Sequence, residues 1–389
     1  MPDLLWLLLP VAAFAGWLAA RRNEGARRSR CTDTMLGPEY FRGLDYLLNE
    51  RPDKAIDVFI RMLEVTADTF ETHLALGSLF RRRGEVDRAI RIHQNLVARE
   101  TLSSEQRTQA RLELGRDYLR VGLLDRAEGL LNELVAHSGC REQVLGMLLD
   151  IYQQEKDWNR AFAVARKMEQ ADGQPVSTVC AQILCEQALQ AVAAGNTQSA
   201  REVLARALAT DGRCARANII LGDLQRDAGN YTAALEAYDC VERQDASRLQ
   251  EVLEAMAECH RETGTLPRMI EYLNSVIERR KGNAPVLLQA ELLSREQGHA
   301  AAEDFLVRQL DRHPSVRGLE KLIDLRRAAG DGQDAIFLQG LRRLTDALQA
   351  SASLYACSNC GFAGRSMHWQ CPGCRRWDTV KPANGAQGI

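Results

Sequence analysis

The sequence is poor in aromatic residues, which make up 6% of its 389 positions, and it has only 10 prolines. An all-β or proline-rich fold needs more of both, so helix is the default expectation. Charge of one sign is also lacking, because 50 Lys and Arg face 52 Asp and Glu for a formal net charge of −2. A chain-wide attraction to nucleic acid is therefore excluded, and any basic function must be local.

Short motifs that mark common catalytic sites are missing too. The sequence has no phosphate-binding G-x-x-x-x-G-K-[ST], no G-x-S-x-G, no H-E-x-x-H and no calcium-binding loop. The seven histidines are spread along the chain. We therefore expect no enzyme, no catalytic or cofactor-binding residue and no small-molecule substrate.

The eleven cysteines are an odd number, and only four of them form a spaced pattern. The other seven occur singly: Cys31, Cys140, Cys180, Cys185, Cys214, Cys240 and Cys259. Free cysteines are commonly buried and inert, so we expect these seven to pack as small apolar residues in a reducing compartment.

One uncharged stretch, LLWLLLPVAAFAGWLAA, runs from residue 4 to residue 20. As a helix rising about 1.5 Å per residue it is roughly 26 Å long, near the lower limit for crossing a membrane. Trp6 and Trp17 stand near its ends, where indoles favour the membrane interface. The sequence therefore predicts a transmembrane anchor at residues 1–20.

A basic linker, residues 21–34, follows this anchor, and its five arginines lie within residues 21–30, where Glu24 is the one acid. Positive charge tends to stay on the cytoplasmic side, so the N-terminus is predicted to lie outside and the rest of the chain inside. A cleaved secretory signal needs positive charge before its apolar run, but Asp3 stands there. We expect a single-pass protein that keeps its anchor.

A pattern of small residues recurs between residues 35 and 350. A glycine is followed twelve residues later by an alanine at Gly43, Gly77, Gly115 and Gly222. The alanine position recurs every 34 to 39 residues, at Ala55, Ala89, Ala127, Ala161, Ala200 and Ala234. This spacing resembles the tetratricopeptide repeat, which implies an all-α superhelical solenoid of about nine helix pairs.

The small residues have a physical meaning in such a repeat. Gly on the first helix and Ala on the second let the two helix axes approach, and a further glycine marks the turn between them. Those turn positions are Gly84, Gly122, Gly195 and Gly229, with Gly264, Gly298 and Gly330 in weaker later copies. Since these residues only pack, we expect binding to fall on the concave face, where an extended peptide or another protein docks.

The last four cysteines form two C-x-x-C pairs, Cys357 with Cys360 and Cys371 with Cys374, ten residues apart. Two such turns complete a tetrahedral four-sulfur metal site, and disulfides are the less favoured alternative. The knuckles of residues 355–389 resemble rubredoxin, and the site suits zinc or iron. We favour one structural zinc, and we expect an aromatic residue of this small domain to pack on the helices.

The same segment carries Arg365, Arg375, Arg376 and Lys381 beside two tryptophans. Cations with stacking aromatic rings suit a nucleic-acid-binding ribbon, but a solvated basic face is the favoured interpretation.

The order of these parts, with the run CSNCGFAGRSMHWQCPGCRRWDTVKP, resembles the lipopolysaccharide assembly protein B family of Gram-negative bacteria over the whole length. The resemblance implies a non-enzymatic inner-membrane adaptor with a periplasmic N-terminus and a cytoplasmic body. It also implies two protein partners, the UDP-acyl-GlcNAc deacetylase that commits precursor to lipid A and the membrane protease FtsH. The alternatives are a rubredoxin-like electron-transfer protein and a membrane scaffold with a nucleic-acid-binding zinc ribbon.

Overall fold

The computed structural model describes residues 45–46, 69–136, 138–172, 176–279, 282–329, 335–350 and 353–383. The predicted anchor, the basic linker and most of the first predicted repeat lie outside these ranges. Within them, no helix is both long enough and apolar enough to cross a membrane.

The chain divides into two compact units, residues 1–140 and 141–389. The helices described in the first unit are α4 (Phe70–Arg83), α5 (Val86–Val97), α6 (Ser104–Val121), α7 (Leu124–Leu134) and the short 3₁₀ helix η2 (Ser138–Cys140).

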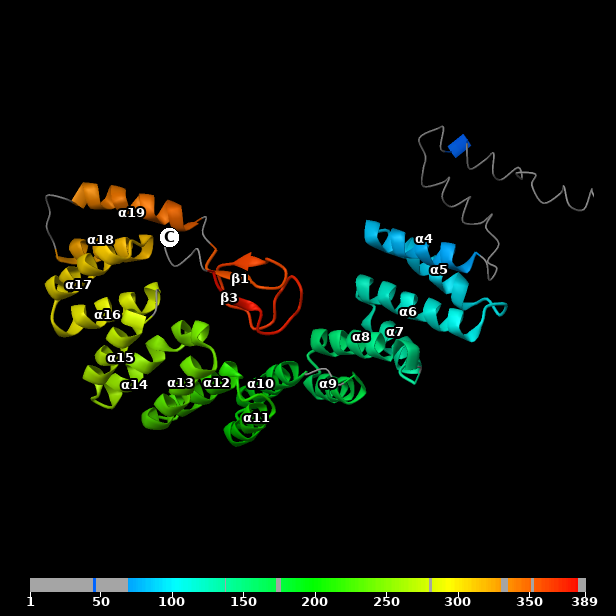
Figure 1. Ribbon diagram of the computed structural model, residues 1–389, viewed down its shortest axis with the longest axis horizontal. Helices are drawn as coiled ribbons and strands as arrows, with labels where there is room; N and C mark the ends of the chain where they lie inside the picture. Colours follow the sequence, from blue (N-terminus) through cyan, green and yellow to red (C-terminus); the bar gives the residue numbers. More distant parts are fainter. Residues whose placement is uncertain are drawn as a thin grey trace, which may run out of the picture. The chain divides into compact units, whose positions relative to one another are not determined.

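The second unit begins with α8 and ends with a three-stranded sheet (Figure 1). Its helices are α8 (Arg141–Gln154), α9 (Trp158–Asp172), α10 (Ser177–Ala193), α11 (Thr197–Thr210), α12 (Ala215–Asp227), α13 (Tyr231–Gln244), η3 (Ala246–Glu251), α14 (Leu253–Glu262), α15 (Leu266–Arg279), α16 (Asn283–Glu296), α17 (His299–Arg312), α18 (Val316–Ala329) and α19 (Ala335–Ala350). Its strands are β1 (Tyr355–Cys357), β2 (Ala363–Gly364) and β3 (Val380–Pro382).

Consecutive helices pack together two by two, α4 with α5, α6 with α7, and so on to α18 with α19. Each pair also contacts the next pair along the chain within its unit, so the buried surface is continuous although no single pair has a core of its own. The predicted solenoid of helix pairs is confirmed for the described residues.

The paired glycine and alanine positions lie where the two helices of a pair approach each other closely, as the spacing predicts. At Gly77 of α4, an added Cβ would lie 2.4 Å from Nε2 of His93 on α5. At Gly222 of α12, it would lie 2.3 Å from Cε1 of Tyr238 on α13. The glycine therefore makes room for a large side chain of the second helix, and the repeat alanine one turn before that side chain is fully buried.

Most turns between paired helices carry a glycine in the left-handed region, with φ between +68° and +90°. Six such glycines are described: Gly84, Gly122, Gly195, Gly229, Gly264 and Gly298. The turn from α8 to α9 has no glycine, and Lys156 takes the left-handed conformation there with φ +57°. Of the weaker later copies, Gly264 keeps the hydrogen bonds of this turn, whereas Gly298 has ψ 170° and caps the start of α17. Gly330 lies outside the described residues.

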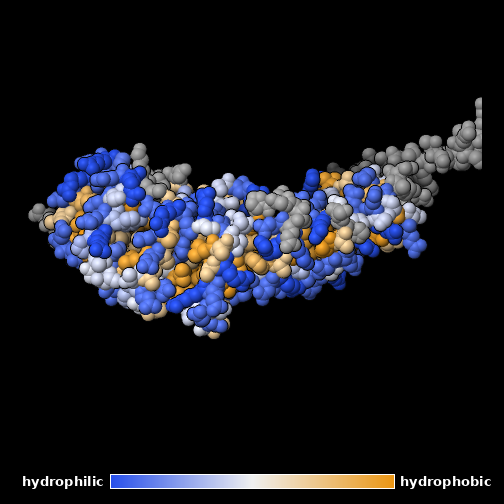
Figure 2. Space-filling view, turned by 60° about the horizontal axis from the view of Figure 1, so that its bottom comes forward, coloured by the Kyte–Doolittle hydropathy of each residue, from blue (hydrophilic) through white to orange (hydrophobic). Residues whose placement is uncertain are grey.

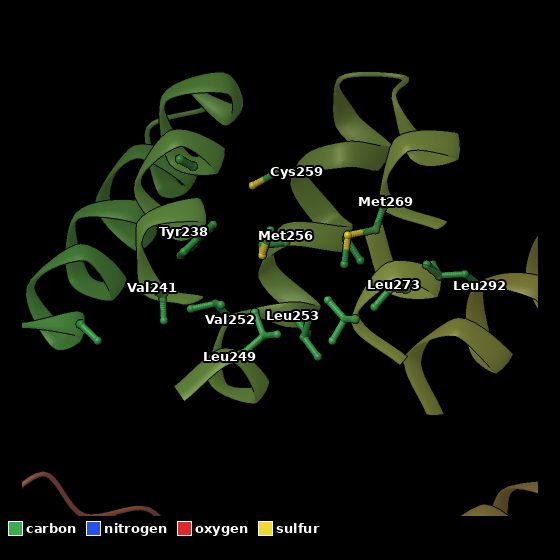
Figure 3. Close-up of a cluster of buried hydrophobic side chains, with 14 residues drawn as sticks. Tyr238, Val241, Leu249, Val252, Leu253, Met256, Cys259, Met269, Leu273 and Leu292 are labelled. Carbon is green, nitrogen blue, oxygen red and sulfur yellow. The ribbon is translucent and has the colours of Figure 1, made fainter. Parts of the chain in front are cut away.

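The core consists of clusters between neighbouring helices, of which Figure 3 shows one. In it, Tyr238 and Val241 of α13 face Met256 of α14, and Met269 and Leu273 of α15 close the other side. The single cysteines behave largely as predicted: Cys140, Cys180, Cys185, Cys214 and Cys259 are buried free thiols, while Cys240 is half-buried. In Figure 2, hydrophilic residues cover most of the visible face, and apolar ones show between them in separate patches.

Gly222→Ala should lower the free energy of unfolding by about 1–3 kcal/mol, because the new methyl group overpacks the α12–α13 contact at Tyr238. Gly146→Ala is the matched control, since Gly146 also lies inside a helix but an added Cβ there meets no atom within 4 Å. The control should be stabilised by about 0.5–1 kcal/mol. Thermal unfolding followed by circular dichroism measures both, and equal midpoints would contradict the packing role of Gly222.

A candidate four-cysteine metal centre docked on the solenoid

The metal-binding domain, residues 355–383, is built on a small antiparallel sheet in the order β2-β1-β3. Tyr355 of β1 pairs with Gly364 of β2 on one side and with Pro382 of β3 on the other. Cys357 closes β1, so the first C-x-x-C turn leads from β1 toward β2. The second turn lies between the isolated bridge partners Gln370 and Trp377.

The four cysteine Sγ atoms all lie within 4.8 Å of one another. The Sγ atoms of Cys357 and Cys374 are 3.7 Å apart, and so are those of Cys360 and Cys371. A disulfide requires about 2.05 Å, whereas a metal–sulfur bond of about 2.3 Å gives a tetrahedral edge of about 3.8 Å. The four predicted ligands therefore have the separations of a tetrahedral four-cysteine metal-binding site.

Glycines in the two C-x-x-C turns allow the backbone to bring the four sulfur atoms together. Gly361 adopts φ +75° directly after Cys360, which lets the first turn close. At Gly373 an added Cβ would lie 3.3 Å from the Sγ of Cys360 and 3.9 Å from that of Cys371, so glycine leaves room for the sulfurs. The N–H of Asn359 donates to the Sγ of Cys357 at 3.4 Å, as expected where a thiolate needs stabilisation.

The surroundings shift the pKa values of Cys357 and Cys360 in opposite directions. The Thr379 hydroxyl, with N–H groups of the first turn, lowers the pKa of Cys357 to about 6. The Phe362 N–H lowers the pKa of Cys360, but desolvation and the neighbouring thiols raise it to about 11. Four thiolates this close together repel one another, so a cation is required before all of them ionise.

Arg248 of η3 makes the central contact between this domain and the solenoid. Its side chain is fully buried, and its Nη2 donates to Asp378 Oδ1 at 2.6 Å. Its guanidinium lies 4.6 Å from the centre of the Trp369 ring, and Nη1 lies 3.0 Å from the sulfur of Met367. One arginine thus holds three residues of the metal-binding domain.

Trp377 forms a second contact, with the helices at the start of the unit. Its ring packs edge-on against Trp158 of α9 at 6.2 Å, and its Nε1 donates to Gln153 Oε1 of α8 at 3.1 Å. Arg216 of α12 lies 5.8 Å from the same ring. The prediction that an aromatic residue packs on the helical body is confirmed.

Two polar contacts complete the docking surface. The Tyr355 hydroxyl donates to Glu251 Oε1 at 2.8 Å, and Lys381 Nζ donates to Asp245 Oδ2 at 2.5 Å. Asp245 precedes η3 and Glu251 is its last residue. The Lys381 ammonium holds the pKa of Asp245 below its usual range although burial opposes this. The domain is therefore fixed to the solenoid by charge as well as by packing.

Sequence reasoning missed the solenoid side of this interface, namely Gln153, Asp245 and the two arginines at positions 216 and 248. Arg365, Arg375 and Arg376 are exposed, as predicted for a solvated basic face, whereas Lys381 is not, because it is paired with two carboxylates. Trp369 and Trp377 are covered by arginines of the helices. Neither ring is thus free to act as a stacking platform for bases, which weakens the nucleic-acid alternative.

A solenoid of helix pairs with a docked four-cysteine domain defines a tetratricopeptide-repeat protein that carries a rubredoxin-type metal-binding domain. Residues 355–382 match the rubredoxin metal binding domain family, and residues 72–105 and 185–248 match tetratricopeptide repeat families. The chain is 37% identical to lipopolysaccharide assembly protein B of Escherichia coli K12 and 33% identical to that of Haemophilus influenzae, with 100% of both chains covered in each case. The chain therefore belongs to the lipopolysaccharide assembly protein B family.

Among solved structures, a tetratricopeptide repeat protein from Parabacteroides merdae aligns with 72% of this chain and 99% of its own. The sequence identity is 14% and the TM-score is 0.34.

Arg248→Ala should release the metal-binding domain from the solenoid, because it leaves Asp378 without its buried partner and uncovers Trp369. Removing one partner of such a pair costs about 2–5 kcal/mol. Hydrogen–deuterium exchange over residues 355–382 should rise strongly. Arg261→Ala on the exposed surface of α14 is the control and should leave exchange unchanged. Unchanged protection in Arg248→Ala would show that the domain docks without this arginine.

Proposed function

We propose that this protein is a non-enzymatic adaptor of the inner membrane in lipopolysaccharide biosynthesis. It binds the UDP-acyl-GlcNAc deacetylase that commits precursor to lipid A and presents it to the membrane protease FtsH. The full-length similarity to lipopolysaccharide assembly protein B carries this proposal. The solenoid fold supports it, because stacked helix pairs offer an extended surface for protein partners.

The proposed mechanism is confinement of the deacetylase to the membrane surface, near the protease. The predicted anchor at residues 4–20 keeps the adaptor at the membrane surface, and the solenoid holds the soluble deacetylase there. Tethering raises the local concentration of substrate near the protease to the order of millimolar for a short flexible link, with no change in the protease's chemistry. The adaptor therefore needs binding surfaces and a fixed geometry, and it needs no catalytic residue.

We further propose that the metal is one zinc per chain, held by Cys357, Cys360, Cys371 and Cys374. Bound zinc neutralises four thiolates and fixes both C-x-x-C turns, which is a structural task. The domain's buried hydrophobic cluster is small, with Val380 and two of the cysteines at its centre. So few apolar residues supply little folding free energy, and the metal makes up the difference.

Metal analysis of the purified protein should show about one zinc per chain, and Cys371→Ser should lose it. Because Trp369 and Trp377 are held between the domain and the solenoid, metal loss should shift tryptophan emission to longer wavelength. Ser351→Cys, which adds a thiol outside the pairs, is a control that should keep its zinc. Full occupancy by iron with a reversible redox transition would instead support the electron-transfer alternative.

In cells, depletion of this protein should lengthen the lifetime of the deacetylase and raise lipopolysaccharide output, because the protease no longer receives its substrate. A chase after translation is stopped, with and without the protein, measures that lifetime. A chain lacking residues 1–20 should fail to restore fast turnover, although it still binds the deacetylase.

A second FtsH substrate, followed in the same chase, is the control and should decay at its normal rate. If the deacetylase half-life does not change while the control substrate decays normally, the adaptor proposal is wrong and the protein supports some other complex.

A further inference from the structure

A cavity of about 490 Å³ lies where the metal-binding domain meets the solenoid. The solenoid contributes η3, the start of α14 and α16, and Arg317 of α18. The metal-binding domain contributes Tyr355, Arg365 and Pro382, and Leu354 just before the first strand completes that wall. Its volume falls in the range of ligand-binding sites, which are roughly 300–1,000 Å³.

Two arginines that line this cavity have no counter-ion among the described residues. Arg317 enters from α18, and Arg365 comes from the segment after β2. The two arginines of the helices that contact the metal-binding domain are paired, since Arg248 is held by Asp378 and Arg216 by Glu186. Two unpaired guanidinium groups facing one cavity form a site suited to a carboxylate or another anion.

The start of α16 adds positive potential to the same wall. Gly282 is its N-cap residue and supplies no side chain to accept from the first-turn N–H groups. Gly282, Asn283 and Ala284 all line the cavity. The dipole of this 14-residue helix therefore favours an anion at the place where the two arginines face.

The remaining walls suit a peptide better than a compact small molecule. Leu249, Leu253 and Val276 lie beneath the charged groups as an aliphatic floor and are no more than 4% exposed, whereas Leu354 is half-buried. A second depression of about 260 Å³, bounded by α14, α16 and α18, shares Leu253 and Arg317 with the cavity and continues the surface along the helices. A groove of this kind accommodates an extended chain.

Glu254 lines both depressions, and Glu291, Glu320 and Asp324 line the second one beside Lys321, so the negative charge of the groove lies away from Arg365 and gives the groove a direction. Glu254 lies on α14, while Arg365 lies on the metal-binding domain. An acidic group therefore fits between the two arginines, and a neutral or basic residue of the same peptide fits beside Glu254.

We propose that this cavity binds an extended peptide segment of a partner protein through an acidic side chain that Arg317 and Arg365 bind. The inference goes beyond the adaptor proposal and does not depend on it, because the chemistry is the same whichever protein supplies the segment. Since Arg317 belongs to the solenoid and Arg365 to the metal-binding domain, the site is complete only while that domain is docked.

A display library of random ten-residue peptides with free C-termini, selected on the purified full chain, tests this proposal. The selected peptides should be enriched in Asp and Glu before their last residue, and amidation of the C-terminus should leave their binding unchanged. Their binding, measured by fluorescence anisotropy, should weaken about tenfold in Arg317→Gln or Arg365→Gln and about a hundredfold in the double variant. The double replacement by Lys should restore part of the affinity.

Arg308→Gln with Arg343→Gln is the matched control, because both arginines are exposed and neither lines the cavity. This control should bind the selected peptides as the parent does, and thermal midpoints confirm that every variant is folded. The proposal is overturned if no peptide is enriched or if the double Arg317/Arg365 variant binds unchanged. Binding that appears only after removal of residues 384–389 also overturns it, because those residues rather than a partner then occupy the cavity. All these outcomes are independent of the deacetylase lifetime, so the two proposals fail separately.

Discussion

The buried guanidinium of Arg248 is the constraint on which the second unit depends. A charge with no exposure to water is tolerated only when it is paired, and Arg248 is paired with Asp378 and lies 3.6 Å from Asp245. Asp378 belongs to the metal-binding domain and adopts a left-handed backbone with φ +54°, which is uncommon for a residue other than glycine. Arg248 and Asp378 are therefore paired with each other only while the metal-binding domain is docked.

Helix pairing and the metal ligands could be predicted because their signals are local. Gly77 and His93 meet within one repeat, and the four cysteines lie within a stretch of 18 residues. The spacing of these residues in the sequence is therefore enough to predict which of them meet. The docking surface could not, because Arg248 and Asp378 are 130 residues apart and neither stands in a recognisable motif. The left-handed conformation of Lys156 could not be predicted either, because the turn from α8 to α9 has no glycine to mark it.

The metal-binding domain changes the mechanics of the solenoid. In a repeat array each repeat contacts only its neighbours, so the distance between repeats that are not neighbours is only weakly constrained. Here one small domain contacts Gln153 on α8, Trp158 on α9, Arg216 on α12 and Arg248 on η3. Figure 1 shows it on the inner side of the arc that these helices form. It thereby links the α8–α9 repeat directly to helices of later repeats.

The charge of the domain fits this structural role better than a nucleic-acid role. Residues 355–383 carry three arginines and Lys381 against the single acid Asp378, an excess of three positive charges. A divalent metal ion bound by four thiolates would carry two negative charges, which would offset most of that excess. Lys381 and Arg248 both pair with Asp378, and the three arginines of the domain are exposed to solvent. The near-neutral domain that results can lie against a helical surface without an uncompensated charge, whereas loss of the metal leaves a basic domain beside buried arginines and so opposes docking.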